Sequence, residues 1–431
     1  MDKIIIRGGR PLTGTIDVGG SKNDSVPIMA AALLVPGVTV LQNVPRITDV
    51  YTFLEILGKL GAMWRFRDDG ALEIDATNLN TYVAPHELVR RMRASFCLLG
   101  VLLARFRQAN VAMPGGCDIG ARPVNYHVKG LEQLGCNLQL EHGIYVGEVE
   151  RFVGATIHLD GPSAGATQHL MIAAATALGV TVLENCAAEP EIVNLAAFLN
   201  ACGAQIEGAG TPVIRIHGVD ELKPCTFAIL PDRLQACTYM LAAAITDGDV
   251  TIRNANLDHC RPVIAKLKEC GIEVRPSPHG IRVRRSGVRI LPTDITTMPH
   301  PGFPTDMQQP FCAMLAMADG VSLITETVYD GRFRYTTELE RMGADIRVQG
   351  RTAKITGVPR LTGAPVTCTD LRAGAALVVA ALAAEGETEV SGLEHLDRGY
   401  EDFSLKLMGL GAEIHRATGT SDPGDLRLCS A

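Results

Sequence analysis

The segment PGGCDIGARP, residues 114–123, combines a cysteine and an arginine with three glycines and two prolines. A thiol close to a fixed positive charge can have a lowered pKa and act in catalysis. Cys117 is therefore a candidate reactive residue, and Arg122 is the cation that follows it. A free cysteine is more often a small buried hydrophobic residue, so this second interpretation stays open until other residues are considered.

Polar side chains also stand at the beginning of six segments rich in alanine and leucine: Lys22, Asn23, Arg93, Ser163, Asp232, Arg233, Asp306, Asp370 and Arg372. A helix N-terminus presents unpaired backbone N–H groups and the positive end of the helix dipole, and it attracts phosphate. If these ends point inward in two facing domains, they line an anion-attracting cleft. The alternative is that the aspartates only cap their helices and that Lys22 is only solvated.

Two turns contribute further arginines. Arg332 and Arg334 lie in TETVYDGRFRYTTEL, and Arg398 follows Asp397 in GLEHLDRGYEDF. The planar guanidinium suits carboxylate and phosphate groups, although arginines are also common on any protein surface.

The six segments that follow these polar residues are apolar almost all round, which predicts buried helices. They read GSKNDSVPIMAAALL, MRASFCLLGVLLA, GPSAGATQHLMIAAATA, LPDRLQACTYMLAAAI, FPTDMQQPFCAMLAMA and TDLRAGAALVVAALAA. β-rich runs such as GVTVLQNV and GDVTIRNA follow most of them. This order favours helices enclosed by an outer wall of sheets.

A second pattern recurs roughly every 70 residues: a leucine, a glycine shortly after it, and then a strand-like run. A glycine at this place is typical of a left-handed helix C-terminus that leads into a strand. The glycines are Gly61, Gly135, Gly203, Gly271, Gly343 and Gly411. Each repeat therefore reads helix–strand–helix–strand–strand, and six repeats predict an α/β protein with three repeats in each of two domains.

Length and composition exclude several classes. The chain has 431 residues, which favours two domains, and its net charge of −7 argues against a general partner of nucleic acid or anionic membranes. No secretory signal and no apolar run of about 18 residues is found, so we expect a cytoplasmic protein. The twelve cysteines form no CxxC pair, which favours reduced thiols rather than disulfides or a zinc site.

The chain resembles the UDP-N-acetylglucosamine enolpyruvyl transferases from residue 21 to residue 402. The segments that carry this resemblance are SKNDSVPIMAAALL, RMRASF, MPGGCDIGARPVNYHVKGLEQLG, AAEPEIVNLAAFL, LPDR, FPTDMQ, ITETVYDGRF, TDLRAG and HLDRGYED. The cysteine loop is the most specific of them, because the related enolpyruvylshikimate-phosphate synthases lack it.

The resemblance implies a fold of two inverse α/β barrels (α/β prisms), each of three repeats. One domain is expected over residues 22–230 and carries the cysteine loop as a mobile lid. The other is expected over residues 1–21 plus 231–431, and a double crossover hinge joins the two.

The resemblance also implies a reaction. The enolpyruvyl group of phosphoenolpyruvate is transferred to the 3'-hydroxyl of UDP-N-acetylglucosamine, phosphate is released, and peptidoglycan synthesis begins. Neither a metal nor an organic cofactor is implied. The expected partners are these two small molecules, without nucleic acid or membrane, and the expected state is a monomer or weak oligomer.

The roles implied for individual residues follow from this chemistry. Cys117 is the general acid that protonates C3, can form a phospholactoyl adduct, and is the thiol that fosfomycin alkylates. Asp306 is the base for the sugar hydroxyl, Asn23 helps to hold the tetrahedral intermediate, and Asp370 belongs to the catalytic set. The phosphoenolpyruvate site consists of Lys22, Asn23, Arg122, Arg372 and Arg398.

The implied nucleotide-sugar site comprises Arg93, Arg122, Pro123, Val124, Asn125, Tyr126, Gly161, Pro162, Ser163, Ala164, Asp306 and Val328. Some of its positions depart from the family pattern: Asn125 and Tyr126 replace Asp and Leu, and Gly161 replaces a longer polar residue. Asp24 stands where a small residue usually follows Lys-Asn. It either weakens phosphoenolpyruvate binding through its charge or caps its helix and points away.

These departures leave two alternative functions open: an enolpyruvyl transferase for another nucleotide sugar, and a non-catalytic paralogue that binds nucleotide sugar as a regulator. The joint presence of Lys22, Cys117, Asp306, Arg372 and Arg398 argues against the non-catalytic alternative.

Overall fold

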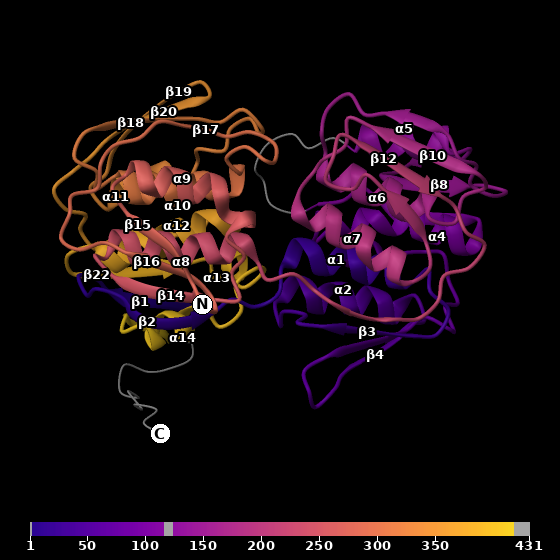
Figure 1. Cartoon of the computed structure of the whole chain (residues 1–431), viewed down its shortest axis with the longest axis horizontal. Helices are drawn as coiled ribbons and strands as arrows, with labels where there is room; N and C mark the ends of the chain where they lie inside the picture. The colour runs from indigo at the N-terminus through magenta and orange to yellow at the C-terminus, as the bar shows by residue number, and fades with distance from the viewer. Residues whose placement is uncertain (1, 116–123, 418–431) are drawn as a thin grey trace. The chain divides into compact units, whose positions relative to one another are not determined.

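The structure is a computed structural model that describes residues 2–115 and 124–417. It divides into two compact units (Figure 1). Unit 1 comprises Met1–Val18, Arg233–Met298 and Gly302–Ala431, and unit 2 comprises Gly19–Asp232 and Pro299–Pro301. Each unit has its own hydrophobic core, since one cluster of buried residues runs from Val26 to Ile229 and the other draws only on unit 1.

Unit 2 contains three repeats. Its helices are α1 (Lys22–Ala32), α2 (Thr48–Lys59), α3 (His86–Val89), the 3-10 turn η1 (Arg93–Cys97), α4 (Leu98–Phe106), α5 (Asn125–Gln133), α6 (Ala164–Ala174) and α7 (Pro190–Ala201). Its strands are β3 (Val38–Gln42), β4 (Met63–Phe66), β5 (Leu72–Asp75), β6 (Gln108–Ala112), β7 (Asn137–Glu141), β8 (Ile144–Glu148), β9 (Thr156–His158), β10 (Val180–Glu184), β11 (Gln205–Glu207), β12 (Val213–His217) and β13 (Thr226–Ala228).

Unit 1 contains the other three repeats. Its helices are α8 (Arg233–Ile245), η2 (Asp258–Cys260), α9 (Arg261–Glu269), η3 (Thr305–Met307), α10 (Gln308–Leu315), α11 (Thr336–Arg341), α12 (Leu371–Ala383), α13 (Leu393–Leu396) and α14 (Phe403–Gly409). Its strands are β1 (Lys3–Arg7), β2 (Thr13–Asp17), β14 (Asp249–Arg253), β15 (Glu273–Ser277), β16 (Gly280–Arg284), β17 (Ile295–Thr296), β18 (Val321–Thr325), β19 (Asp345–Gln349), β20 (Thr352–Thr356), β21 (Pro365–Thr367), β22 (Glu387–Ser391) and β23 (Glu413–Ala417).

The alanine- and leucine-rich segments form the centre of each unit, as the sequence predicts. Every residue of α8 from Leu234 to Ile245 is buried, and α1, α4, α6, α10 and α12 are buried along most of their length. In unit 1 of Figure 1, α8, α10 and α12 lie inside a wall of strands. A helix without a polar face has to be covered on all sides, and the surrounding sheets provide that cover.

The sheets repeat one strand order: a parallel edge strand, the strand after the buried helix, and then two antiparallel strands, which form a hairpin except in the last sheet, where β1 and β23 come from opposite ends of the chain. The orders are β9–β10–β12–β11, β13–β3–β5–β4, β2–β14–β16–β15, β17–β18–β20–β19 and β21–β22–β1–β23. The remaining sheet, β6–β8–β7, has an isolated parallel bridge from Val83 to Asn110 at the equivalent edge. The parallel edge strand is the one element of the repeat that the sequence pattern does not predict.

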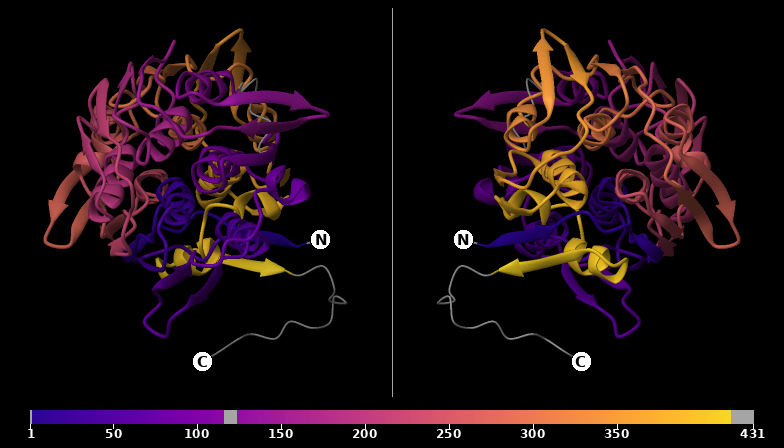
Figure 2. Two further views of the ribbon diagram at one scale, coloured as in Figure 1. Left: turned by 90° about the vertical axis from the view of Figure 1, so that its right-hand side faces the viewer. Right: turned by 90° about the vertical axis from the view of Figure 1, so that its left-hand side faces the viewer.

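Two edge strands are exchanged between the units. β2 precedes α1 of unit 2 in the chain but pairs with β14 of unit 1, whereas β13 precedes α8 of unit 1 but pairs with β3 of unit 2. The chain therefore passes between units at Val18–Gly19 and again at Asp232–Arg233. The N-terminal strand β1 completes the last sheet by pairing with β22 and β23. In Figure 2 the yellow strand β23 lies close to the indigo strand at the N-terminus.

The six repeat glycines all have positive φ, as predicted for left-handed helix ends. The angles are 99° at Gly61, 95° at Gly135, 104° at Gly203, 81° at Gly271, 90° at Gly343 and 96° at Gly411. Glycine adopts this conformation without the steric cost that a Cβ atom imposes.

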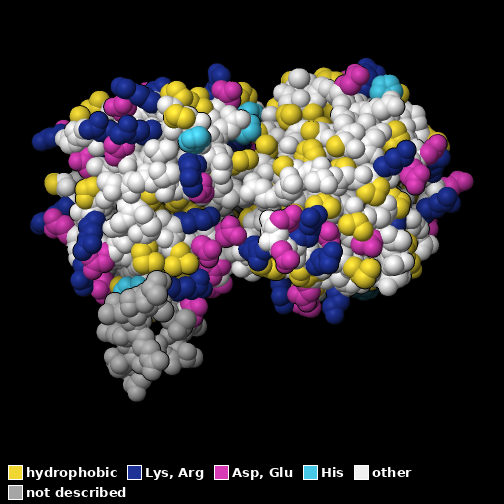
Figure 3. All heavy atoms as spheres, turned by 60° about the horizontal axis from the view of Figure 1, so that its bottom comes forward, with side chains coloured by type: hydrophobic (Ala, Val, Ile, Leu, Met, Phe, Trp, Pro, Cys, Tyr) yellow, Lys and Arg dark blue, Asp and Glu magenta, His cyan; other side chains and the backbone are white. Residues whose placement is uncertain are grey.

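The surface mixes charges of both signs. On the face drawn in Figure 3, Lys and Arg side chains are interspersed with Asp and Glu side chains over both units. Within the described part of the chain, no helix is long and apolar enough to cross a membrane.

Candidate active site

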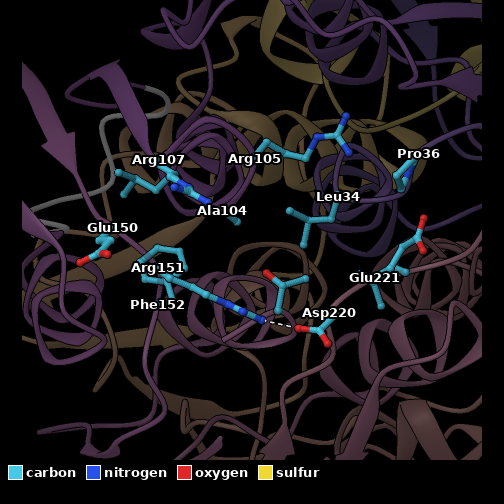
Figure 4. A pocket seen from close by; sticks show the side chains of 13 residues that line it. Leu34, Pro36, Ala104, Arg105, Arg107, Glu150, Arg151, Phe152, Asp220 and Glu221 are labelled. Carbon is cyan, nitrogen blue, oxygen red and sulfur yellow. Dashed lines mark hydrogen bonds and ion pairs between the residues drawn. The ribbon is translucent and has the colours of Figure 1, made fainter. Parts of the chain in front are cut away.

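In unit 2 the N-terminal ends of the three buried helices lie at one end of the unit. A cavity of about 280 Å³ lies at the C-terminal ends of these helices (Figure 4). It is lined by residues at or just after the ends of α1, α4 and α6, among them Leu34, Arg105 and Thr176. α1, α4 and α6 also contact one another, and their N-terminal ends lie away from this cavity. Lys22, Arg93 and Ser163 stand at those N-terminal ends.

Lys22 at the start of α1 pairs with a carboxylate from the neighbouring helix α2. Its Nζ lies 3.3 Å from Oδ2 of Asp49, which is buried. Asn23 beside it is exposed. The pair fixes the direction of the lysine while its amino group stays partly accessible, since 18% of the Lys22 side chain is exposed.

The predicted nucleotide residues occupy the starts of two helices. Val124 is the N-cap residue of α5, and the side chain of Ser163 caps α6 by accepting a hydrogen bond from the Ala166 N–H at 3.3 Å. Tyr126 and Gly161 are neighbours, because a Cβ atom on Gly161 would lie 3.6 Å from the Tyr126 hydroxyl. Two of the expected departures from the family pattern are thus adjacent, and the larger Tyr126 stands beside the residue without a side chain.

Two buried histidines support this region. The Gly100 N–H donates to Nε2 of His169 at 2.8 Å, so the proton of His169 is on Nδ1 and is donated to Nδ1 of His127 at 2.9 Å. Burial lowers the pKa of His169 to about 3, and burial, His169 and Arg93 lower the pKa of His127. Both rings are therefore neutral near pH 7. The Nε2 edge of His127 faces Gly165 in the first turn of α6.

In unit 1 the central feature is Asp306, held between two buried arginines. Arg332 donates to Oδ1 at 2.7 Å, and Nε of Arg372 donates to Oδ2 at 3.2 Å. Burial alone would lower the pKa of Arg332, but Asp306 and Asp370 raise it above its ordinary value. The carboxylate remains accessible, since 27% of the Asp306 side chain is exposed, against 3% of each arginine side chain.

The turn that carries Val328 is organised by the buried carboxylate of Glu326. Its Oε1 accepts from the backbone N–H of Val328 at 2.8 Å and from the Thr297 hydroxyl at 2.8 Å. Its Oε2 accepts from the Thr305 hydroxyl at 2.7 Å, and Arg332 donates to the same hydroxyl oxygen. Val328 and Asp306 are thus held by one connected hydrogen-bond network.

The N-terminal ends of α8, α10 and α12 converge through side chains. Asp370 is the N-cap of α12, where its Oδ1 accepts from the N–H groups of Arg372 and Ala373, and its Oδ2 accepts from Gln309 of α10 at 3.1 Å. Arg372 donates to the Tyr400 hydroxyl at 3.1 Å, and Thr238 of α8 bonds the same hydroxyl at 2.8 Å. The capping interpretation thus holds for Asp370, whereas Asp306 belongs to a 3-10 turn and pairs with arginines.

The predicted site residues that the structure describes are divided between the two units. Unit 2 contains Lys22, Asn23, Arg93, Val124, Asn125, Tyr126 and Gly161–Ala164. Unit 1 contains Asp306, Val328, Asp370, Arg372 and Arg398. Cys117, Arg122 and Pro123 lie outside the described residues.

Three residues of these networks have no signal in the sequence. Asp49, Glu326 and His127 are remote in sequence from the residues they position, namely Lys22, Asp306 and the first turn of α6. Over the described ranges, no group of three or more His, Cys, Asp or Glu side chains could hold a metal ion. The ten described cysteines are free thiols, and Sγ of Cys202 lies 3.4 Å from Sγ of Cys225.

Two inverse α/β barrels with polar and charged residues at the N-termini of their buried helices define a class. The model of the EPSP synthase (3-phosphoshikimate 1-carboxyvinyltransferase) family matches residues 6–407. The chain belongs to this family of enolpyruvyl transferases, and the predicted fold class is confirmed.

Similar proteins match nearly the full length of the chain. UDP-N-acetylglucosamine 1-carboxyvinyltransferase 3 of Caldanaerobacter subterraneus subsp. tengcongensis is 51% identical over 96% of this chain and 99% of its own. UDP-N-acetylglucosamine 1-carboxyvinyltransferase 2 of Carboxydothermus hydrogenoformans is 50% identical over 97% of this chain and 100% of its own.

Solved structures agree with this assignment. The enolpyruvyl transferase NikO from Streptomyces tendae superimposes with a TM-score of 0.88 at 27% identity, covering 96% of this chain and 98% of that one. EPSP synthase from Acinetobacter baumannii reaches a TM-score of 0.76 at 20% identity, over 97% of this chain and 100% of that one, and shares the fold.

Proposed function

We propose that the chain transfers the enolpyruvyl group of phosphoenolpyruvate to the 3'-hydroxyl of UDP-N-acetylglucosamine, with release of phosphate, at the start of peptidoglycan synthesis. The observation that carries this proposal is the identity of about half of all residues, over nearly the whole chain, with proteins named for this activity. The same names disfavour another acceptor sugar and a non-catalytic role. The proposed place of action is the cytoplasm, as a monomer or weak oligomer.

The anion of phosphoenolpyruvate is bound, in this proposal, by Lys22, Arg122, Arg372 and Arg398. Asn23 is exposed next to Lys22 and holds the intermediate. Because Nε of Arg372 also donates to Asp306, an anion that joins Arg372 shares this guanidinium with the proposed base. Asp370 acts indirectly, by capping the helix turn that presents Arg372. Binding of the anion is thereby linked to the orientation of Asp306.

The chemical steps need an acid and a base. Cys117 protonates C3 of phosphoenolpyruvate, and Asp306 accepts the proton of the sugar hydroxyl as this hydroxyl attacks C2. The tetrahedral adduct then loses phosphate from C2 and a proton from its C3 methyl group, which restores the C2–C3 double bond of the enolpyruvyl product. Arg332 donates to Oδ1 of Asp306, and Arg372 donates to Oδ2. The partly exposed carboxylate is therefore held in one orientation. The residues Arg93, Val124–Tyr126, Gly161–Ala164 and Val328 bind the nucleotide sugar.

The test is phosphate release from phosphoenolpyruvate with UDP-N-acetylglucosamine, with shikimate 3-phosphate, and without acceptor. We expect release only with the sugar nucleotide, and a product heavier by one enolpyruvyl group. Cys117→Ala and Asp306→Asn should each lower kcat by about a hundredfold or more, the usual contribution of an acid or base. Asp319→Asn, which removes an exposed carboxylate of unit 1 paired with Arg289, should leave kcat unchanged. Release with shikimate 3-phosphate alone would refute the proposed acceptor.

A further inference from the structure

Asp24 is a fully buried carboxylate in the first turn of α1, directly after Lys22 and Asn23. It does not cap its own helix, whose N-cap residue is Ser21. Its Oδ2 accepts two hydrogen bonds from residues far away in the sequence: the backbone N–H of Leu230 at 2.8 Å and Nδ2 of Asn194 in α7 at 2.6 Å. The expectation that Asp24 caps its helix is therefore wrong.

The partner Leu230 belongs to the segment in which the chain leaves unit 2. This segment is already bonded to the other crossing segment, since the Ser21 N–H donates to the Leu230 carbonyl at 2.7 Å and the Asp232 N–H donates to the Gly19 carbonyl at 2.9 Å. Asp24 adds a side-chain link between these crossing segments and the first turn of α1. The same turn presents Lys22.

The charges around Asp24 disfavour its ionised form. Burial raises its pKa to about 7, the two hydrogen bonds lower it, and the carboxylates of Glu191 in α7 and of Asp232 raise it further. Among the described residues that shift this pKa, none is a cation, and Lys22 pairs with Asp49 instead. Oδ1 of Asp24 is buried and has no hydrogen-bond partner among the described atoms.

We propose that Asp24 is a positioning residue that links the Lys22–Asn23 turn to the crossing segment at Leu230, and that loss of its proton favours opening of this link. A buried carboxylate without a cation is stabilised when water reaches it, so ionisation favours the open form. The effect on turnover rests on the proposed function, whereas the link itself does not.

The sign of the pH dependence follows from linkage. The pKa of Asp24 is higher in the closed, folded form than the ordinary value that it has when exposed. Its contribution to stability is therefore fully present below about pH 4 and is lost as the pH rises towards about 7. Above that range the carboxyl is ionised in both forms, so the loss is complete and constant.

The test uses the full chain and two substitutions of Asp24. Asp24→Asn keeps an acceptor for Leu230 but cannot ionise, and Asp24→Ala removes the acceptor. Asp220→Asn is the matched control, because it removes an exposed carboxylate of unit 2 that pairs with Arg151. Hydrogen exchange at the Leu230 amide should become about tenfold faster or more in Asp24→Ala, and should stay close to the native rate in Asp24→Asn and Asp220→Asn.

Thermal unfolding between about pH 4 and pH 9 tests the ionisation. The melting temperature of Asp24→Asn should rise relative to the native chain up to about pH 7 and keep a constant difference above it. The Asp220→Asn curve should run parallel to the native curve. Parallel curves for Asp24→Asn, or unchanged Leu230 exchange in Asp24→Ala, would overturn the proposal, and Asp24→Asn serves alone if Asp24→Ala does not fold.

Turnover supplies the readout that a purely structural role would not move. The ratio of kcat/KM for phosphoenolpyruvate, Asp24→Asn over native, should be near one at about pH 6. It should rise about threefold or more by about pH 8, because ionisation of native Asp24 opens the link that holds the turn of Lys22 and Asn23. A ratio that is flat with pH would remove the catalytic consequence. No turnover in either protein, with the exchange and unfolding results as expected, would contradict the proposed function and leave the link standing.

Discussion

At the scale of single residues, the candidate site depends on which carboxylate meets which cation. Lys22 contacts Asp49, while Asp24, two positions along the chain, contacts an amide and a backbone N–H. Asp306 is held by Arg332 and Arg372, and both arginines are buried. Side chains in such ion pairs keep a fixed orientation, because moving one partner away would leave the other charge buried without an opposite charge.

Replacement of Arg332 tests this arrangement. Arg332→Gln should destabilise the fold by about 3 kcal/mol, the lower end for breaking a buried ion pair, because Asp306 remains partly solvated. It should also lower kcat, since Oδ1 of Asp306 loses its partner. Arg332→Lys should restore less than half of both losses, because an ammonium group cannot reach Thr305 and Asp306 with one planar fork.

Urea unfolding and initial rates measure these effects. The exposed pair of Arg289 with Asp319 offers the control, and Arg289→Gln should change stability by about 0.5 kcal/mol or less. An Arg332→Gln variant that unfolds within about 1 kcal/mol of the native chain would show that the Arg332 pair does not hold the turn.

At the scale of elements, each of the six repeats depends on the position of one glycine. Each outer helix ends at a glycine with positive φ, and the chain then enters a strand of the sheet; this strand begins a hairpin in every repeat except the last, where β23 pairs with β1. The strand before the buried helix has a parallel partner in most repeats, and for α1 and α8 that strand belongs to the other unit's sheet. Local turns thus define each repeat, and the pairing of β2 and β13 determines where the chain passes between the units.

Two glycine substitutions, one just after an outer helix and one inside another, should have opposite effects on stability. Gly203→Ala should cost about 1–2 kcal/mol, because φ is 104° there and no neighbouring atom lies within 4 Å of the new Cβ, which leaves only the backbone strain. Gly58→Ala, inside α2 and with its Cβ in ordinary contact at 3.7 Å from Trp64, should stabilise the protein by about 0.5–1 kcal/mol. Denaturant unfolding of both variants gives the comparison, and equal effects of the same sign would contradict the assignment of Gly203 as a left-handed end.

At the scale of the whole molecule, each unit has a hydrophobic core of its own. The two buried clusters share no residue, and both divide at the points where the chain crosses between units. Unit 2 is almost entirely one continuous stretch, whereas unit 1 is assembled from the two ends of the chain. The predicted site residues are therefore divided between two units whose buried clusters are separate.

Residues 19–232 produced alone should fold. We expect cooperative thermal unfolding with a helical circular dichroism signal, because the fragment contains the whole core of unit 2 and its exchanged strand β13. The matched fragment 19–224 lacks β13 and leaves the edge of β3 unpaired, so its melting temperature should be lower. Failure of 19–232 to unfold cooperatively would show that unit 2 needs unit 1 to fold.

Much of this architecture could be predicted from the sequence, because it is encoded by neighbours along the chain. Apolar helices without a polar face, glycines at left-handed ends and cations at helix starts all depend on residues within one or two turns of each other. The six buried helices and the positions of Lys22, Arg93, Ser163, Asp306 and Arg372 at or near their N-terminal ends follow from such local patterns.

Only the tertiary structure decided the long-range pairings. It assigned Asp49 to Lys22, Leu230 to Asp24 and Glu326 to the turn of Val328, and it placed β1 between β22 and β23. The physical reason is that such contacts join segments tens to hundreds of residues apart. Their partners are selected by how whole helices and sheets pack, and no periodicity within a single segment records that choice.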